Sequence, residues 1–258
     1  MSTISKVLCL PGYLQSGSTF AKKASGLRKI LSKQLNIELD FISPCQPIKS
    51  RYELGFPLAA TEEESDKVWD TIVANENNCR WFDHRGPSDN HGLEESMEFI
   101  MKHIEKNGPY DGVIGFSQGA AMAIMVTNSL RKMLPSHPDF KIGLFVSGFC
   151  LTVPKSGETF EGIEKITNLK EYQSKVEIAP DAAKYTQLQD PDNFNTEILI
   201  VYGKNDSIVL PIRSQYVAGL YKKNVHIFAH EGAHLLPNQK AFVKPIADLF
   251  DKALTGKL

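Results

Sequence analysis

One serine in the sequence lies in a setting that would make it a nucleophile. Ser117 is the centre of G-F-S-Q-G (115–119), which follows the short apolar run 113–114 and precedes a run of small and apolar residues, 120–134. Gly-x-Ser-x-Gly between a strand and a helix is typical of a nucleophile elbow. Glycines suit such a turn because a Cβ two residues before or after the serine would clash. The unpaired N–H groups at the start of the following helix favour negative charge there. The pattern therefore predicts a catalytic serine rather than a plain strand–helix turn.

A carboxylate and a histidine follow later strands in the order that a hydrolase triad requires. The apolar run 197–202 predicts a strand with Asp206 shortly after it, and the run 225–229 predicts another with His234 after it. Triad residues of α/β-hydrolases occur in the chain order Ser, Asp, His. A histidine that is neutral near pH 7 can take the serine proton, and a carboxylate on its other ring nitrogen fixes its tautomer. We therefore predict Ser117 as nucleophile, His234 as general base and Asp206 as the orienting carboxylate.

Each of the later two assignments has an alternative. His230 lies directly at a strand end and competes with His234 for the role of base. The triad histidine usually lies a few residues into the loop, which favours His234. The alternative for Asp206 is an ordinary exposed turn aspartate. Asp190 and Asp192 precede the strand and are poorer candidates for the triad.

A competing motif belongs to a different class of enzyme. His230-Glu231-Gly232-Ala233-His234 matches H-E-x-x-H, the signature of zinc metallohydrolases. That chemistry needs both histidines on one face of a helix, whereas here a β-like run leads into the motif, Gly232 weakens a helix and Pro237 ends it. We therefore expect a loop, and neither a metal nor another cofactor. A non-catalytic binding module on the same fold is disfavoured because a nucleophile, an acid and a base are all present.

The negative charge formed during acyl transfer needs two N–H donors beside the serine. One is predicted to be the backbone N–H of Gln118, directly after the nucleophile. The other is expected in the loop after the first strand, with Tyr13 favoured and Leu14 next.

Strands and helices that alternate along the whole chain must position these groups. The apolar runs predict strands at 6–10, 37–42, 113–114, 141–146, 197–202 and 225–229, and helical spacing predicts helices at 20–35, 67–75, 92–106, 120–134, 161–172, 211–221 and 241–254. This alternation predicts an α/β fold with a mostly parallel sheet and helices on both faces. We expect a single domain over 1–258 with irregular insertions at about 44–66 and 151–195, long enough for functional loops.

Composition excludes several classes of partner. The chain has 258 residues, 42% hydrophobic and 23% charged, with a formal net charge of -1. This balance gives no reason to expect nucleic acid or an anionic membrane as partner. No run has the length of a membrane span, and no N-terminal stretch resembles a secretory signal. The four cysteines lack metal-ligand spacing and suit a reducing compartment. We expect a cytoplasmic protein, with the nucleus as alternative; the oligomeric state stays open.

Several motifs together resemble the fungal family of serine hydrolases that is related to the human ovarian-cancer-associated serine hydrolase. They are V-L-C-L-P-G-Y-L-Q-S-G, S-G-L-R-K, N-G-P-Y-D-G-V-I-G-F-S-Q-G-A-A, V-S-G-F, Y-G-K-N-D and E-G-A-H-L-L-P-N, in this order along the chain. The resemblance implies an α/β-hydrolase fold, a triad of Ser117, Asp206 and His234, and hydrolysis of carboxylic esters without a cofactor. The family usually has His-Gly after the first strand, where this chain has Pro11-Gly12.

The substrate is predicted to be a small-molecule ester with an apolar acyl chain. Apolar residues in and beside the two insertions could line an acyl pocket or simply pack the core: Phe56, Leu58, Trp69, Trp81, Phe82, Phe149 and Phe160. The G-F-S-Q-G elbow is shared with acyl-protein thioesterases, to which the family is related. Thioesters and lysophospholipids therefore stay as alternative substrates.

Overall fold

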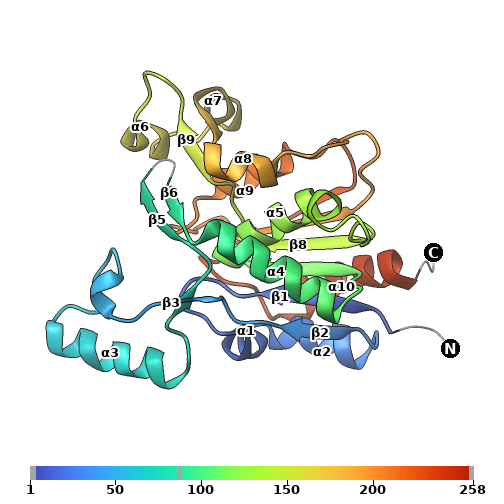
Figure 1. Cartoon of the computed structure of the whole chain (residues 1–258), viewed down its shortest axis with the longest axis horizontal. Helices are drawn as coiled ribbons and strands as arrows, with labels where there is room; N and C mark the ends of the chain where they lie inside the picture. The colour runs from blue at the N-terminus through green and yellow to red at the C-terminus, as the bar shows by residue number, and fades with distance from the viewer. Residues whose placement is uncertain (1–3, 87–88, 256–258) are drawn as a thin grey trace.

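Six parallel strands form the central sheet of the protein (Figure 1). The computed structural model of the chain describes residues 4–86 and 89–255. The strand order is β12-β11-β8-β7-β1-β2, and every neighbouring pair is parallel. The strands are β1 (Lys6–Leu10), β2 (Glu38–Phe41), β7 (Gly112–Phe116), β8 (Ile142–Val146), β11 (Glu197–Gly203) and β12 (Val225–His230). The predicted parallel α/β sheet is thus confirmed.

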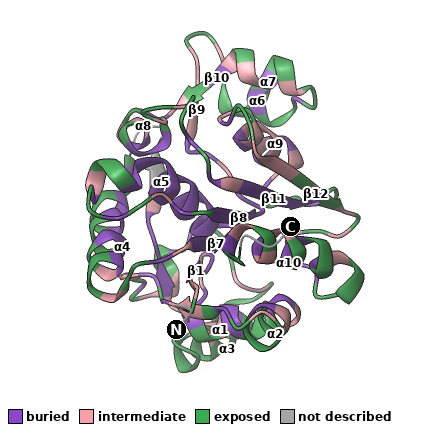
Figure 2. Ribbon diagram, turned by 90° about the vertical axis from the view of Figure 1, so that its right-hand side faces the viewer, coloured by how far each residue is buried: buried purple, intermediate pink, exposed green. Residues whose placement is uncertain are grey.

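Helices cover both faces of this sheet because its inner strands bury residues on both sides. In β1, Leu8 and Leu10 pack into one apolar cluster, and Val7 and Cys9 pack into the other. The first face is covered by α4 (Leu93–Asn107), α5 (Gln118–Met133), α8 (Pro180–Thr186) and α9 (Pro211–Ala218). The second face is covered by α1 (Gly17–Lys23), α2 (Ser25–Lys33) and α10 (Lys240–Thr255). Figure 2 shows the buried strands between these helix layers, whose outer sides are exposed.

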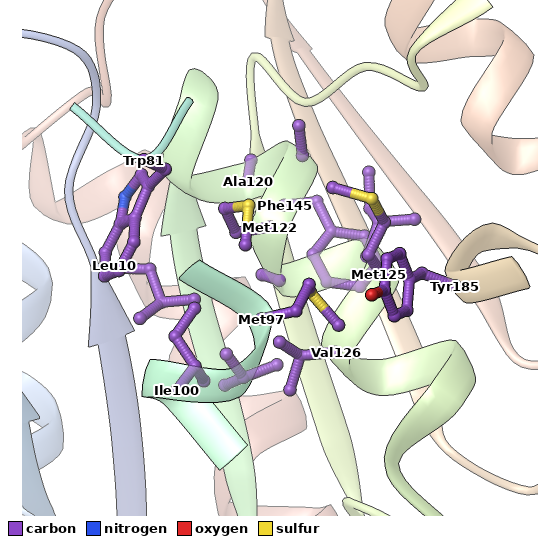
Figure 3. Close-up of a cluster of buried hydrophobic side chains, with 14 of the residues drawn as sticks. Leu10, Trp81, Met97, Ile100, Ala120, Met122, Met125, Val126, Phe145 and Tyr185 are labelled. Carbon is purple, nitrogen blue, oxygen red and sulfur yellow. The ribbon is translucent and has the colours of Figure 1, made fainter. Parts of the chain in front are cut away.

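The larger apolar cluster fixes α5, the helix that follows Ser117. Figure 3 shows Trp81 and Leu10 at one end of this cluster, Tyr185 at the other, and Met122 and Met125 of α5 between them. All of α5 from Gln118 to Leu130 is buried. Each fully buried large apolar side chain stabilises the fold by about 1.5–3 kcal/mol. The position of α5 against the sheet is therefore strongly determined.

The order of the strands reverses between β1 and β7. After β1 the chain adds β2 on one side, and it then returns to place β7 on the other side. In open parallel sheets, such a reversal leaves a crevice at the carboxyl ends of the two strands. The loop after β1 and the turn at Ser117 meet there.

The first predicted helix, 20–35, is in fact two helices. Ser16 caps α1 by accepting the N–H of Thr19, and α1 ends at Lys23 because the backbone of Ala24, its C-cap, leaves the helical region. A second helix, α2, starts directly afterwards at Ser25. Continuous apolar spacing concealed this break because both helices pack on the same side of the sheet.

The segment 44–66 is more ordered than an irregular insertion. It contains β3 (Gln46–Pro47), the short 3-10 helix η1 (Arg51–Glu53) and the first turn of α3 (Glu62–Ala74). Helix α3 starts earlier than the predicted 67–75 because Thr61 caps it by accepting the N–H of Glu64. The chain then returns through β4 (Cys79–Arg80), which pairs with β3, and through the hairpin of β5 (Asp83–Gly86) and β6 (Asp89–His91).

The segment 151–195 also differs from the prediction of one helix at 161–172 within a long loop. It contains β9 (Thr152–Pro154), α6 (Phe160–Glu164), α7 (Leu169–Lys175), β10 (Val176–Ile178) and α8. Thr159 and Asn168 cap α6 and α7 separately, so two short helices replace the single one. Strand β10 pairs with β9 antiparallel and closes the segment on itself.

Within the described ranges 4–86 and 89–255, no helix has the length and apolar character needed to cross a bilayer.

Candidate active site

Ser117 occupies a strained turn between β7 and α5. Its backbone angles are φ 53° and ψ -119°, a conformation that costs a non-glycine residue about 1–3 kcal/mol. A Cβ built on Gly115 would lie 2.4 Å from the carbonyl oxygen of Gly119, and one on Gly119 would lie 2.2 Å from the carbonyl oxygen of Leu10. Both glycines of G-F-S-Q-G are therefore required by close backbone approach, as the motif predicted.

Asp206 is buried in the loop after β11 and accepts hydrogen bonds on both carboxylate oxygens. Its Oδ1 accepts the N–H groups of Ile208 and Val209, each at 2.9 Å. Its Oδ2 lies 2.8 Å from Nδ1 of His234 and accepts the hydroxyl of Ser147 at 3.0 Å. Burial alone would raise the pKa of Asp206, but the bonds from His234 and Val209 outweigh it, and the pKa is lowered. Asp206 is therefore a carboxylate at neutral pH.

His234 lies between Asp206 and the cavity that contains Ser117. Its ring centroid lies 4.9 Å from that of Phe116, the residue before the serine. His234 and Ser117 line one cavity of about 710 Å³. The structure thus brings together all three residues predicted for the triad. In this state, the Ser117 hydroxyl makes no hydrogen bond to a described residue; such bonds often tighten only when substrate binds.

His230, the alternative base, belongs to a different environment. It is the last residue of β12, its Nδ1 accepts the N–H of Gly232 at 3.1 Å, and its ring packs edge-on against Phe242. Burial lowers the pKa of His230. Asp206 accordingly bonds to His234 rather than to His230.

The H-E-x-x-H match does not form a zinc-binding helix. His230 ends a strand, and 231–235 are bends. Glu231 points to Lys204, with 2.5 Å between the charged atoms. In 4–86 and 89–255 there is no group of three or more His, Cys, Asp or Glu side chains placed to hold a metal ion. The helical geometry on which the metallohydrolase alternative depends is therefore absent.

The loop after β1 presents the amide of Tyr13 near the serine. The amide of Leu14, the other candidate donor, is used by the carbonyl of Cys79 at 3.0 Å. The amide of Gly12 donates to Oε1 of Gln15 at 3.3 Å. The amide of Tyr13, in contrast, donates to no residue in the described chain, and Tyr13 lines the Ser117 cavity. Gln118, the other predicted donor, is the first residue of α5.

The side chain of Gln118 has a role that the motif did not reveal. Its Oε1 accepts the N–H of Trp81 at 2.8 Å, and its Nε2 donates to the carbonyl of Phe82 at 2.8 Å. The indole N–H of Trp81 donates to the carbonyl of Pro11 at 2.8 Å. These bonds join the residue after the nucleophile to the loop that carries Tyr13. Trp81 therefore positions the site instead of lining an acyl pocket.

Ser147 is a site residue that sequence reasoning missed. It follows β8, is fully buried, has a positive φ of 47°, and bonds to Asp206. The only signal in the sequence was its place at the end of a strand, within V-S-G-F.

A second cavity, of about 590 Å³, adjoins the first. Ile208 lines both cavities, and Gln118 lines the second. Three of the apolar residues predicted for an acyl pocket line the second cavity: Phe82, Phe149 and Phe160. Phe56 lines the Ser117 cavity. Trp81 is a core residue. Leu58 and Trp69 line neither of these two cavities.

Comparison with known proteins shows the family to which this chain belongs. Residues 1–246 match the family model described as serine hydrolase (FSH1). Esterase C25G4.2 of Caenorhabditis elegans is 24% identical, over 98% of this chain and 96% of its own length. A protein of Schizosaccharomyces pombe named dihydrofolate reductase is 30% identical over 99% of this chain. The match covers 49% of that protein's length, so this chain spans about half of that relative.

Solved structures show the same fold. The crystal structure of esterase PE8 superposes with a TM-score of 0.55 at 15% identity, covering 98% of this chain and 94% of that one. A central parallel sheet with helices on both faces is common to an α/β-hydrolase and this chain. The shared fold alone does not assign a family, but the family model does, because it matches nearly the whole sequence. The chain belongs to the serine hydrolase (FSH1) family and has the α/β-hydrolase fold.

Proposed function

We propose that the protein is a serine esterase that cleaves carboxylic esters through an acyl-enzyme intermediate, with Ser117 as nucleophile. His234 is the general base and Asp206 the carboxylate that orients it. The observation that carries this proposal is the 2.8 Å contact between Asp206 and His234, in a structure where His234 shares a cavity with the strained Ser117.

The reaction follows from this arrangement. With Asp206 at Nδ1, the neutral imidazole of His234 presents Nε2 as acceptor for the Ser117 proton. Serine Oγ then bonds to the ester carbonyl carbon, and the imidazolium returns the proton to the alcohol as the C–O bond breaks. Water repeats the sequence on the acyl-enzyme, releases the carboxylic acid and restores Ser117.

We assign to the backbone amides of Tyr13 and Gln118 the stabilisation of the oxyanion in both tetrahedral intermediates. The amide of Tyr13, which donates to no described residue, and the position of Gln118 at the first turn of α5 support this assignment. Replacement of one oxyanion donor in a serine protease costs about 10²–10³ in kcat, which indicates the size of this contribution.

The acyl group is proposed to be apolar. Phe82, Phe149 and Phe160 contribute aromatic surface to the cavity next to Gln118, and Phe56 contributes to the Ser117 cavity. Thioesters are a second substrate class, supported by the G-F-S-Q-G elbow, because the same nucleophile and base would cleave them. Comparing oxygen and thiol esters with the same acyl group distinguishes the two.

The nucleophile is tested by Ser117→Ala. Because the reaction begins with attack by the Ser117 hydroxyl, the variant is expected to lose labelling by a fluorophosphonate probe and hydrolysis of p-nitrophenyl esters. Ser129→Ala, which removes another buried serine hydroxyl on α5, is the matched control and should keep both. Labelling that persists in Ser117→Ala would place the nucleophile elsewhere.

A further inference from the structure

The cavity beside the proposed active site contains a cation that its apolar walls do not explain. Arg213 lies in the first turn of α9 and lines the cavity of about 590 Å³ together with Phe149, Leu151 and Ile163. It is partly buried, and burial lowers its pKa. An arginine nevertheless stays charged in proteins. An apolar chain would gain nothing from this charge.

The ring of Phe149 holds the guanidinium of Arg213 in place without neutralising it. The central carbon of the guanidinium lies 4.3 Å from the centroid of the Phe149 ring. Stacking on an aromatic ring uses the flat face of the group and leaves its five N–H donors at the edge. Tyr172, on α7, lines the same cavity as Arg213, and its hydroxyl lies 3.3 Å from Oγ1 of Thr152, which also lines the cavity. The two hydroxyls and the guanidinium form a polar corner in the cavity.

No carboxylate in the described chain forms an ion pair with Arg213. Glu164, on α6, lines the same cavity but acts on Arg213 only at longer range. Other partly or fully buried arginines differ. Arg80 pairs with Glu53 at 3.2 Å, and Arg51 pairs with Asp66 at 2.5 Å. Because buried charges in proteins are normally paired, the cavity lacks the counter-ion that Arg213 requires.

We propose that Arg213 binds an anionic oxygen group, a carboxylate or a phosphate, that the ester substrate carries away from its scissile bond. The planar fork of a guanidinium matches such a group with two parallel hydrogen bonds. Because the hydroxyls of Tyr172 and Thr152 bond to each other, one of the two would remain free to donate to this group. The inference rests on the proposed esterase function and names a substrate class for the same site: esters with an apolar chain and a terminal negative charge.

The experiment has two arms, which distinguish the part of the substrate that carries the charge. The acyl arm compares mono-p-nitrophenyl esters of straight-chain dicarboxylic acids with p-nitrophenyl esters of monocarboxylic acids of equal length. The leaving-group arm compares an acyl-coenzyme A, which carries phosphates, with the same acyl group on N-acetylcysteamine. The readout in each arm is the ratio of kcat/KM for the charged substrate to that for the neutral one.

We expect the wild-type ratio to exceed one in one of the two arms. If that is the acyl arm, the preference should occur at one chain length. Arg213→Met should lower this ratio by about tenfold or more, the usual effect of a hydrogen bond to a charged group. Arg213→Lys keeps the charge but lacks the fork, so its ratio should fall between these two. Glu164→Gln removes a repelling charge and should raise the ratio. Arg131→Met, which changes an exposed arginine paired with Asp139, is the matched control and should leave the ratio unchanged.

Three results would overturn the inference. The first is a wild type that hydrolyses neutral substrates but shows no preference for charge in either arm. The second is a preference that Arg213→Met retains. The third applies if circular dichroism shows that Arg213→Met does not fold. In that case the inference is overturned when Arg213→Lys and Glu164→Gln both keep the wild-type ratio. A wild type that cleaves no ester or thioester would instead overturn the proposed function itself.

Discussion

At the scale of single residues, the site depends on how firmly Asp206 is held. Four donors surround its two oxygens: two backbone amides, one hydroxyl and the imidazole of His234. Only the imidazole would take part in proton transfer. The other three fix the carboxylate so that it can fix the histidine.

The charge of Asp206 is tested by Asp206→Asn. The amide has the same shape, and its oxygen can still accept the N–H groups of Ile208 and Val209, so the fold should persist. An amide NH₂ facing Nδ1 would select the tautomer that carries hydrogen on Nε2, which cannot take the serine proton. The expected fall in kcat is up to about 10⁴, as in a serine protease with the corresponding change. Unchanged kcat for p-nitrophenyl esters would assign the orienting role to another carboxylate.

Ser147 is expected to act as a positioning residue through Asp206. Ser147→Ala removes one hydrogen bond to a buried carboxylate, a loss that usually costs about 1.5–3 kcal/mol. The expected result is a lower kcat for ester hydrolysis with little change in KM, because substrate contacts remain. Ser214→Ala is the matched control, since this buried serine donates to the carbonyl of Gly148 instead. An equal fall in kcat in both variants would mean that Ser147 contributes only to stability.

At the scale of elements, the turn between β7 and α5 connects the fold to the site. The sequence predicted this connection well, because the clash at Gly115 and Gly119 leaves a local signature that no other residue type can supply. The positions of Asp206 and His234 were also predictable, since each follows a predicted strand, a strongly apolar one at 197–202 and a more polar one at 225–229. The residues that contact these side chains in the folded protein were not predictable. Nothing local in the sequence indicates that Ser147 bonds to Asp206 or that Gln118 bonds to the 81–82 segment.

The errors in element prediction have a common physical cause. Helices α6 and α7 are short, and their boundaries depend on caps at Thr159 and Asn168 rather than on a long apolar face. Periodicity over a long window merges such helices or misses them. The separate caps would have been the better signal.

Gly119→Ala tests the element-scale contact directly. A Cβ there would lie 2.2 Å from the carbonyl oxygen of Leu10 and 2.3 Å from that of Pro11, so α5 must move away from β1. Overpacking of this kind costs about 1–3 kcal/mol of stability. A displacement of about 1 Å at the nucleophile can cost about 10² in rate. We therefore expect lower Tm and much slower ester hydrolysis, whereas Gly55→Ala, whose Cβ would meet no atom within 4 Å, should change neither. Full activity in Gly119→Ala would show that the turn tolerates the shift.

At the scale of the whole molecule, the edge strand β2 pairs with only one neighbour in the sheet, β1, and gains further contacts through a side chain. Asp40 supplies them. Its Oδ2 lies 2.8 Å from Nε2 of His103 on α4 and also accepts the hydroxyl of Tyr110, which precedes β7. The three residues thus join segments that are far apart in the chain and belong to the edge and one face of the sheet.

The contribution of Asp40 to stability is expected to depend on pH. Burial alone would raise the pKa of Asp40, but hydrogen bonds from Tyr110 and His103 outweigh it, and the pKa is lowered below its usual value of 3.8. The folded state therefore binds the proton more weakly than the unfolded state. The stabilisation is complete well above pH 3.8 and is lost as the pH falls through the lower, folded-state value.

Asp40→Asn should therefore lower Tm at pH 7, and its difference from wild type should shrink as the pH falls below about 4. Circular dichroism melts of both proteins between pH 3 and 8 measure this difference. Asp248→Asn is the matched control, because Asp248 pairs with Lys244 on the exposed side of α10 and surface pairs contribute little. A Tm difference for Asp40→Asn that stays constant over the whole range would show that the carboxylate charge is not what joins β2 to α4. The contact would then stabilise the edge of the sheet through shape and neutral hydrogen bonds alone.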